Sequence, residues 1–290
     1  MTKTKPDIFL VFQMAKVASR SWMKLLEATL PNSTIVHFHV ISDKRVNRVK
    51  RLIEKTDRHQ TIKHLTNASI GHPPKQIQPF IVNGQWIGPE TKIITGVRDP
   101  VARAISAVGF QCNRLGYTRF GVTPRDGGTA ENLIDIFYRA LKAAQSNNTQ
   151  NDTLVSHLAR VITNYNLWFK EELTPAFGVD ISNTPFNRET RCLQLNGKHS
   201  LFAYRVEDLL NNDTEKILLK STSDFIGERV TNFPQSDTSK ENRYQALYTD
   251  FVKKIKLSDK DMDWFYNNDV VSKFYSPHEV EVFKSRWRRH

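Results

Sequence analysis

The stretch that decides the fold reads Ile8-Phe9-Leu10-Val11-Phe12-Gln13-Met14-Ala15-Lys16-Val17-Ala18-Ser19-Arg20-Ser21-Trp22, an apolar run that ends in a short basic turn rich in hydroxyl groups. Ile8–Phe12 has the length and the β-branched and aromatic content of a buried parallel strand. Apolar residues then recur at helical spacing from Trp22 to Leu30. We therefore expect a strand, a turn and the start of a helix that Ser19 or Ser21 can cap.

The turn between this strand and this helix has the properties of an anion site. The first N–H groups of a helix and the positive end of its dipole point into the preceding turn, where Lys16 and Arg20 add full charges. Such a turn suits a phosphate or a sulfate. The alternative is an ordinary junction with a serine cap and two solvated cations, and this stretch alone leaves both interpretations open.

A second junction of the same kind lies further along the chain. Ile93–Val97 is predicted to be a buried strand, after which Asp99 can cap a helix that has Pro100 at its first position. Arg98 lies at the carboxyl end of this strand, and Ser106 lies about two turns into the helix. A forked guanidinium and a hydroxyl can together hold a second phosphate. The alternative is a helix start with surface arginines.

The rest of the chain alternates between strand and helix signals. Thr34–Ile41 is predicted to be a strand, and Ser200–Leu209 a strand that leads into a turn. The spacing of apolar residues predicts helices over Leu133–Ala144 and Leu154–Phe169. The aromatic residues of the last helix are expected to lie in the core. This alternation indicates the α/β class. With no internal repeat or linker, residues 1–290 are expected to form a single domain.

Composition limits the partners and the compartment. The 290 residues carry a net charge of +12, which favours polyanions such as nucleic acid, acidic polysaccharide, anionic lipid or a highly charged nucleotide. The two cysteines form no disulfide framework, and this favours a reducing compartment. No apolar run reaches the roughly 18 residues that span a bilayer, and no signal sequence is recognisable. We expect a cytoplasmic protein.

The two junctions resemble the donor-binding motifs of sulfotransferases that use 3′-phosphoadenosine 5′-phosphosulfate (PAPS). Ala15–Trp22 is similar to their 5′-phosphosulfate loop, with Ala15 where Pro is frequent and Ala18 where many members have Gly. Arg98-Asp99-Pro100, followed by Arg103 and Ser106, is similar to their 3′-phosphate motif. Other segments, Trp168–Leu173 and Arg205–Leu209 among them, resemble the sulfotransferase-like capsular polysaccharide synthesis proteins, so the resemblance covers nearly the whole chain.

The resemblance implies both a fold and a reaction. The fold would be P-loop-like, with three layers, a central parallel sheet flanked by helices, and helical additions. The reaction would move a sulfuryl group from PAPS to a hydroxyl of a polysaccharide, oligosaccharide or glycolipid by in-line displacement. 3′-Phosphoadenosine 5′-phosphate (PAP) would be the product, and no metal would be needed.

The resemblance also assigns roles to individual residues. Lys16 would contact the bridging oxygen and stabilise the departing nucleotide. Arg98 and Ser106 would hold the 3′-phosphate. The 5′-phosphosulfate would be held by the backbone N–H groups and hydroxyls of the loop, from Val17, Ala18, Ser19, Arg20, Ser21 and Trp22.

A hydroxyl acceptor also needs a general base, for which His72 is the candidate. This histidine lies in a Gly-His-Pro segment expected at a sheet edge, where it can take up a proton near neutral pH. A comparable Gly-His occurs at the base position of some polysaccharide sulfotransferases. His37, His39 and Glu90 are the competing candidates.

Two functions of other classes are the alternatives to a sulfotransferase. A P-loop kinase or other phosphotransferase would carry Gly-x-x-x-x-Gly-Lys-Ser/Thr, which this chain lacks. A non-enzymatic basic protein that binds a polyanion is favoured by the charge, but no nucleic-acid recognition module is present and no nucleic acid partner is expected. Peripheral membrane contact and the oligomeric state are left open.

Overall fold

The structure is a computed structural model that describes residues 8–41, 78–114, 128–147, 154–234 and 243–288. The chain divides into two compact units. The first comprises Met1–Arg98 and Trp168–Ser236, and the second comprises Asp99–Leu167 and Asp237–His290. The expectation of a single domain over residues 1–290 stays a prediction.

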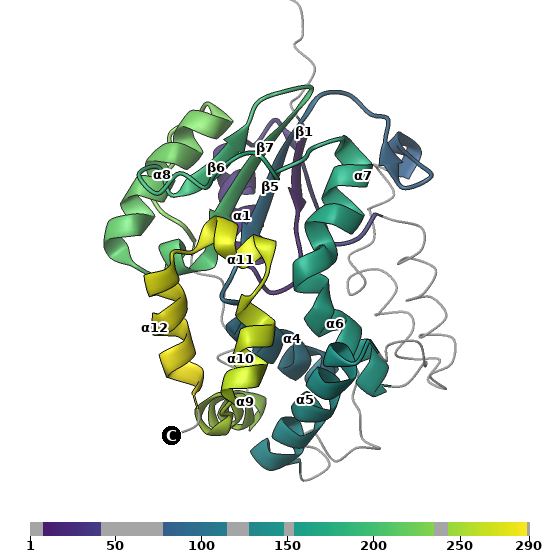
Figure 1. Cartoon of the computed structure of the whole chain (residues 1–290). Coiled ribbons are helices and arrows are strands. Elements are labelled where there is room, and N and C mark those ends of the chain that lie inside the picture. Colours follow the sequence, from purple (N-terminus) through teal and green to yellow (C-terminus); the bar gives the residue numbers. More distant parts are fainter. Residues whose placement is uncertain (1–7, 42–77, 115–127, 148–153, 235–242, 289–290) are drawn as a thin grey trace, which may run out of the picture. The chain divides into compact units, whose positions relative to one another are not determined.

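A five-stranded sheet forms the centre of the first unit, in the order β2-β1-β5-β7-β6 (Figure 1). Neighbouring strands run parallel except β6, which is antiparallel to β7. The strands are β1 (Ile8–Phe12), β2 (Thr34–Phe38), β5 (Thr91–Val97), β6 (Cys192–Leu195) and β7 (His199–Arg205). The predicted α/β class with a mainly parallel central sheet is confirmed.

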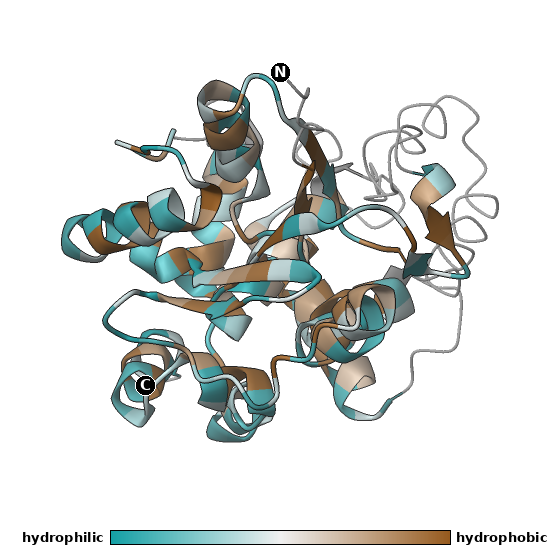
Figure 2. Cartoon of the chain, turned by 90° about the horizontal axis from the view of Figure 1, so that it is seen from above, coloured by the Kyte–Doolittle hydropathy of each residue, from teal (hydrophilic) through white to brown (hydrophobic). Residues whose placement is uncertain are grey.

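Helices cover both faces of this sheet. On one face the Phe202 ring of β7 contacts Trp22 of α1 (Ser19–Thr29) and Phe225 of α8 (Asn212–Ile226). On the other face the Phe12 ring lies 5.5 Å from that of Phe177, at the end of α7 (Thr174–Phe177). Accordingly α8 and α7 lie on opposite sides of the strands (Figure 1). The strands are mainly hydrophobic, whereas the helices carry both hydrophobic and hydrophilic residues (Figure 2).

The described part of the first unit also contains several short elements. A small antiparallel hairpin pairs β3 with β4, and a π-helical turn leads directly into α7. Their bounds are Gln78–Phe80 and Val206–Leu209 for the two 3₁₀ helices, Ile81–Val82 for β3, Gln85–Trp86 for β4 and Phe169–Leu173 for the π-helix.

The second unit is helical in the residues that the structure describes. Its helices are α4 (Pro100–Arg114), α5 (Ala130–Gln145), α6 (Leu154–Trp168, whose last residue belongs to the first unit), α9 (Arg243–Lys254), α10 (Asp259–Tyr266), α11 (Asp269–Phe274) and α12 (Pro277–Trp287). None of the helices in the described ranges is both long and apolar enough to cross a membrane.

Asp99 organises the second unit. Its buried carboxylate caps α4 by accepting the Val101 N–H at 3.0 Å, as predicted. The same carboxylate accepts the Tyr266 hydroxyl at 2.7 Å and the Trp287 indole N–H at 2.9 Å, from α10 and α12. Asp99 therefore begins α4 and bonds to side chains of α10 and α12. These three donors stabilise its buried carboxylate, since a buried charge without hydrogen bonds is costly.

Among the described residues, the predicted elements agree with the structure apart from one strand. The helices over Leu133–Ala144 and Leu154–Phe169 are present, and the aromatic residues of the latter, such as Trp168, are buried. The strand predicted over Thr34–Ile41 ends at Phe38. After Phe38 the backbone bonds to the π-helical segment: Trp168 Nε1 donates to the His39 carbonyl, and the Ile41 N–H donates to Glu172.

Candidate anion-binding site

The turn between β1 and α1 contains two residues in the left-handed region. Lys16 has φ 72° and Ala18 has φ 64°. This region costs a non-glycine residue about 1–2 kcal/mol, so the surrounding structure must hold the turn in place. Successive N–H groups in such a backbone form a concave anion-binding nest.

The prediction that Ser19 or Ser21 caps this helix is wrong. Helix α1 begins at Ser19, and its N-cap is Ala18, which has no side chain able to accept a hydrogen bond. A serine cap needs extended backbone at the capping residue, whereas Ala18 is left-handed. The left-handed backbone also gives a physical reason for the glycine that many similar loops carry at this position.

Two backbone N–H groups in the first turn of α1 can donate to an anion in the nest. The N–H groups of Ser21 and Trp22 both donate to the Ala18 carbonyl, at 3.1 and 3.3 Å. Ser19 and Arg20 occupy the first two helical positions, where no carbonyl one turn earlier within the helix can accept their N–H groups. An anion in the turn can therefore bond to these N–H groups and interact with the positive end of the helix.

Trp22 anchors the start of this helix in the core. Its indole is fully buried, 4.8 Å from the Tyr204 ring and 5.0 Å from the Phe233 ring. Because its backbone N–H is already used within the helix, Trp22 contributes packing to the turn rather than a donor.

Three cations, Lys16, Arg20 and Arg98, interact at the turn between β1 and α1. The pKa of Lys16 is lowered from 10.5 to about 8, first by burial and then by the positive charges of Arg98 and Arg20. β1 and β5 are neighbouring parallel strands, so Lys16 and Arg98 follow their strands at the same edge of the sheet. Like charges held together in a partly buried site favour the binding of an anion, which relieves their repulsion.

Two histidines lie beside the turn. Burial, with the charges of His39 and Arg20, lowers the pKa of His37 to about 3, which makes it a weak base. His39 lies 2.6 Å, through Nδ1, from the Gln13 carbonyl oxygen. A carbonyl can only accept, so Nδ1 carries the proton and Nε2 is the basic nitrogen of His39.

The other predicted site residues are distributed as follows. Arg98 belongs to the first unit, whereas Ser106 is a buried residue of α4 in the second. Arg103 of the same motif is also buried in the second unit, where both terminal nitrogens of its guanidinium donate to the Val161 carbonyl at 3.1 Å. His72 lies outside the described residues. Glu90 precedes the amino end of β5, at the sheet edge opposite Lys16.

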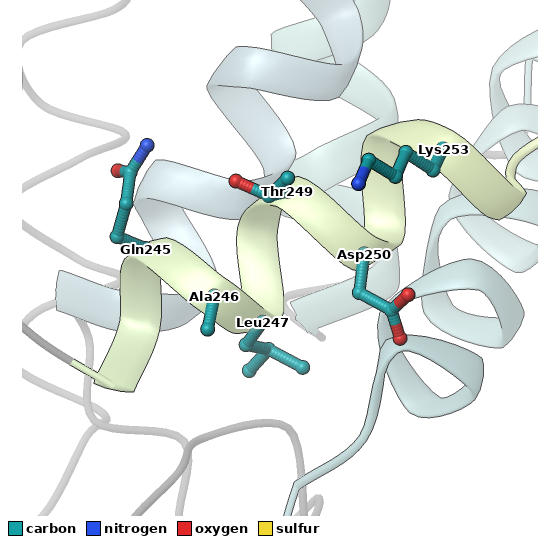
Figure 3. Close-up of a pocket in the computed structure, with 6 residues that line it drawn as sticks. All are labelled: Gln245, Ala246, Leu247, Thr249, Asp250 and Lys253. Carbon is teal, nitrogen blue, oxygen red and sulfur yellow. The ribbon is translucent and has the colours of Figure 1, made fainter.

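In the described part of the chain, two surface cavities are lined by residues outside the turn. One, of about 770 Å³, runs along α9 and is lined by Thr249, Asp250 and Lys253 among others (Figure 3). The other, of about 410 Å³, lies between the end of α1 and residues 228–234 of the first unit. Within the described ranges, no group of three His, Cys, Asp or Glu side chains is placed to hold a metal ion.

Comparison of the chain with protein-family models, curated proteins and solved structures found no match.

Sequence reasoning missed the residues beneath the turn. The buried Tyr204 hydroxyl bonds to the Val17 carbonyl, and it contacts Gln13 Oε1 at 3.0 Å. One signal could have led to them: Gly96 interrupts a strand of larger residues, and an isolated glycine in a strand often marks the close approach of another group. That group is the Tyr204 ring.

The lowered pKa of Lys16 makes anion binding pH-dependent. We expect the affinity for inorganic sulfate to fall as the pH rises through about 8, because the ammonium loses its proton there. Lys16→Arg, which stays charged, should flatten this dependence. Calorimetric titrations between pH 6.5 and 9.5 would measure both. Equal pH dependence in the two proteins would contradict the assignment.

The same pKa shift affects stability. The unfolded chain holds the Lys16 proton up to about pH 10.5, whereas the folded chain releases it near pH 8, so the unfolded state binds more protons between these values. The contribution of Lys16 to the free energy of unfolding therefore rises from pH 8 to pH 10.5.

Ala18→Gly is expected to stabilise the protein. Glycine adopts the left-handed backbone without steric cost, so the free energy of unfolding should rise by about 1 kcal/mol and the Tm by roughly 2–4 °C. Ala246→Gly, on the exposed face of α9, is the control and should lower stability by about 0.5–1 kcal/mol. Thermal and urea denaturation measure both, and a destabilising Ala18→Gly would show that this position is not strained.

Proposed function

We propose that the protein is a sulfotransferase that moves the sulfuryl group of PAPS to a hydroxyl of a carbohydrate acceptor, whether polysaccharide, oligosaccharide or glycolipid. The observation that carries the proposal is the grouping of Lys16, Arg20 and Arg98 around a nest whose backbone is left-handed at Lys16 and Ala18. A donor with a 5′-phosphosulfate and a 3′-phosphate brings negative charge to two places, which matches cations that follow two neighbouring strands.

Each residue has a separate task in this proposal. The loop N–H groups and the hydroxyls of Ser19 and Ser21 orient the 5′-phosphosulfate, and the Lys16 ammonium stabilises the charge that develops on the leaving phosphate oxygen. The Arg98 guanidinium holds the 3′-phosphate, and Ser106, a residue of the second unit, stays the partner that the sequence motif predicts. The donor is oriented for in-line attack by the acceptor hydroxyl, and the products are the sulfate ester and PAP.

The acceptor hydroxyl has to lose a proton during the transfer. His72 remains the predicted base. Among the competing candidates, His37 is disfavoured because burial, with the charges of His39 and Arg20, lowers its pKa to about 3. Glu90 is disfavoured by its position at the opposite edge of the sheet.

The proposed fold is the P-loop-like three-layer arrangement. Helices on both faces of the sheet and an anion nest at the carboxyl end of β1 support it. The nest differs from that of a P-loop kinase because Lys16 and Ala18 take the left-handed positions without any glycine in the turn.

Calorimetric titration of the full chain with PAP, ATP and duplex DNA tests the proposal. We expect PAP to bind most tightly, because only PAP carries the 3′-phosphate that Arg98 is proposed to hold. A preference for ATP would indicate a phosphotransferase, and a preference for DNA would indicate a polyanion-binding protein. For the acceptor, labelled sulfuryl transfer from PAPS to a panel of oligosaccharides and glycolipids is the corresponding assay.

A further inference from the structure

We propose that Tyr204 is a positioning residue that holds the peptide between Val17 and Ala18 in the orientation that lets the turn bind an anion. Tyr204 lies in β7, far from the turn in sequence, and has no place in the sequence motifs described above. The identity of the anion, the 5′-phosphosulfate of the donor, rests on the proposed function. The conformational role of Tyr204 does not.

The first observation is the hydrogen bonding of the Tyr204 hydroxyl. Tyr204 is fully buried, and its hydroxyl bonds to the Val17 carbonyl, 187 residues away, and contacts Gln13 Oε1. Burial raises the pKa of Tyr204 well above 10, so the hydroxyl keeps its proton and remains a donor. The Val17 carbonyl is therefore held toward the interior of the first unit.

Peptide geometry connects this bond to the nest. In a trans peptide the C=O and the following N–H point in opposite directions, so fixing the Val17 carbonyl toward the core directs the Ala18 N–H away from it. A reversed peptide would place a carbonyl oxygen where the donor had been, and that oxygen would repel an anion.

The second observation is that this orientation is strained. Ala18 has φ 64°, and rotation of the preceding peptide would let it return to a region that alanine prefers. The buried hydrogen bond from the single proton of the Tyr204 hydroxyl to the Val17 carbonyl opposes this rotation, because the rotation would break it.

The third observation is that the strand beside Tyr204 leaves room for its ring. A Cβ atom at Gly96 would lie 2.6 Å from Tyr204 Cζ and 2.8 Å from its hydroxyl oxygen. Gly96 and Tyr204 are register partners in β5 and β7, so the absence of a side chain at Gly96 lets the ring lie across the sheet and reach Val17. Trp22 packs 4.8 Å away on the same ring.

Tyr204→Phe, alone and combined with Ala18→Gly, tests the proposal. The phenylalanine keeps the ring packing and removes only the hydroxyl, and we expect the affinity for PAP to fall about tenfold. Because glycine accepts the left-handed backbone without strain, the double variant should recover to within about threefold of the wild type. Tyr138→Phe is the control, since its hydroxyl donates to the Lys256 carbonyl in the second unit, and it should bind PAP as the wild type does.

The outcomes separate this proposal from the proposed function. Unchanged affinity in Tyr204→Phe, or an equal loss in the single and double variants, would overturn the role of Tyr204. If the wild type does not bind PAP, the sulfotransferase proposal fails, and melting temperatures without ligand still test Tyr204. Ala18→Gly should then raise the Tm less in the Tyr204→Phe background, where Ala18 is already relaxed, than in the wild type; equal increases would overturn the proposal.

One measurement needs no variant. If the Val17–Ala18 peptide is fixed as described, the ¹⁵N–¹H resonance of Ala18 in the wild-type chain should shift on addition of sodium sulfate, and its amide should exchange more slowly with solvent. An Ala18 amide unaffected by saturating sulfate and by PAP would overturn the proposal even if Tyr204→Phe failed to fold.

Discussion

Lys16→Ala is expected to lower the rate of sulfuryl transfer from PAPS by at least about 100-fold, while the affinity for PAP falls much less. The reason is that negative charge develops on the leaving phosphate oxygen only in the transition state, so the ammonium contributes most there. With a pKa of about 8, Lys16 is still mainly protonated at neutral pH. Labelled transfer to a hydroxyl acceptor gives kcat, and calorimetry gives the affinity for PAP.

The matched control for this prediction is Lys24→Ala. Lys24 is exposed on the same helix, so its removal changes the net charge equally without touching the nest. It should change kcat by less than about twofold, as expected for an exposed residue away from the site. Unchanged turnover in Lys16→Ala, or equal losses in the two variants, would exclude a role for Lys16 in leaving-group stabilisation.

Arg98→Ala is expected to weaken the binding of PAP by about 100-fold. Arg98 follows β5 at the same sheet edge as Lys16, and a guanidinium can hold a phosphate through two parallel hydrogen bonds. The loss should depend on the 3′-phosphate. The affinity of Arg98→Ala for adenosine 5′-phosphosulfate, which lacks that group, should be less than about threefold below that of the wild type.

Two further variants sharpen the Arg98 prediction. Arg98→Lys keeps the charge but not the fork, so an intermediate affinity is expected. Arg139→Ala removes an exposed arginine of α5, which pairs with Asp135, and should leave the affinity for PAP unchanged. If Arg98→Ala weakened both nucleotides equally, Arg98 would act through general charge rather than through the 3′-phosphate.

Local signals were sufficient for most of the secondary structure. Ile8–Phe12 and Ile93–Val97 are strands because short β-branched runs suit buried parallel strands, and the cap at Asp99 was predictable because a carboxylate before Pro100 can accept the first N–H groups of a helix. The strand starting at Thr34 ends early because its last residues bond to Trp168 and Glu172. Contacts between residues so far apart in the sequence cannot be predicted from the local pattern of residues.

The candidate site was predictable in its residue types more than in its conformation. The basic turn around Lys16 could be recognised because cations, hydroxyls and a helix start coincide within a few residues. Its serine cap was predicted wrongly, because Ser19 and Ser21 have the right chemistry but the backbone at Ala18 is left-handed. The alanine itself does not indicate a positive φ; only the glycine that many similar loops carry at this position does.

The sequence by itself therefore determined the α/β class, the two strand-to-helix junctions and the position of Lys16 and Arg98 after their strands, because these depend on residues within about two turns of one another. Only the tertiary structure decided that β1 and β5 are neighbours and that Arg103 is used inside the second unit. It also decided that Tyr204 reaches Val17 through the space at Gly96. The physical reason is that packing brings together residues nearly two hundred positions apart, and the sequence around each residue does not indicate its distant partner.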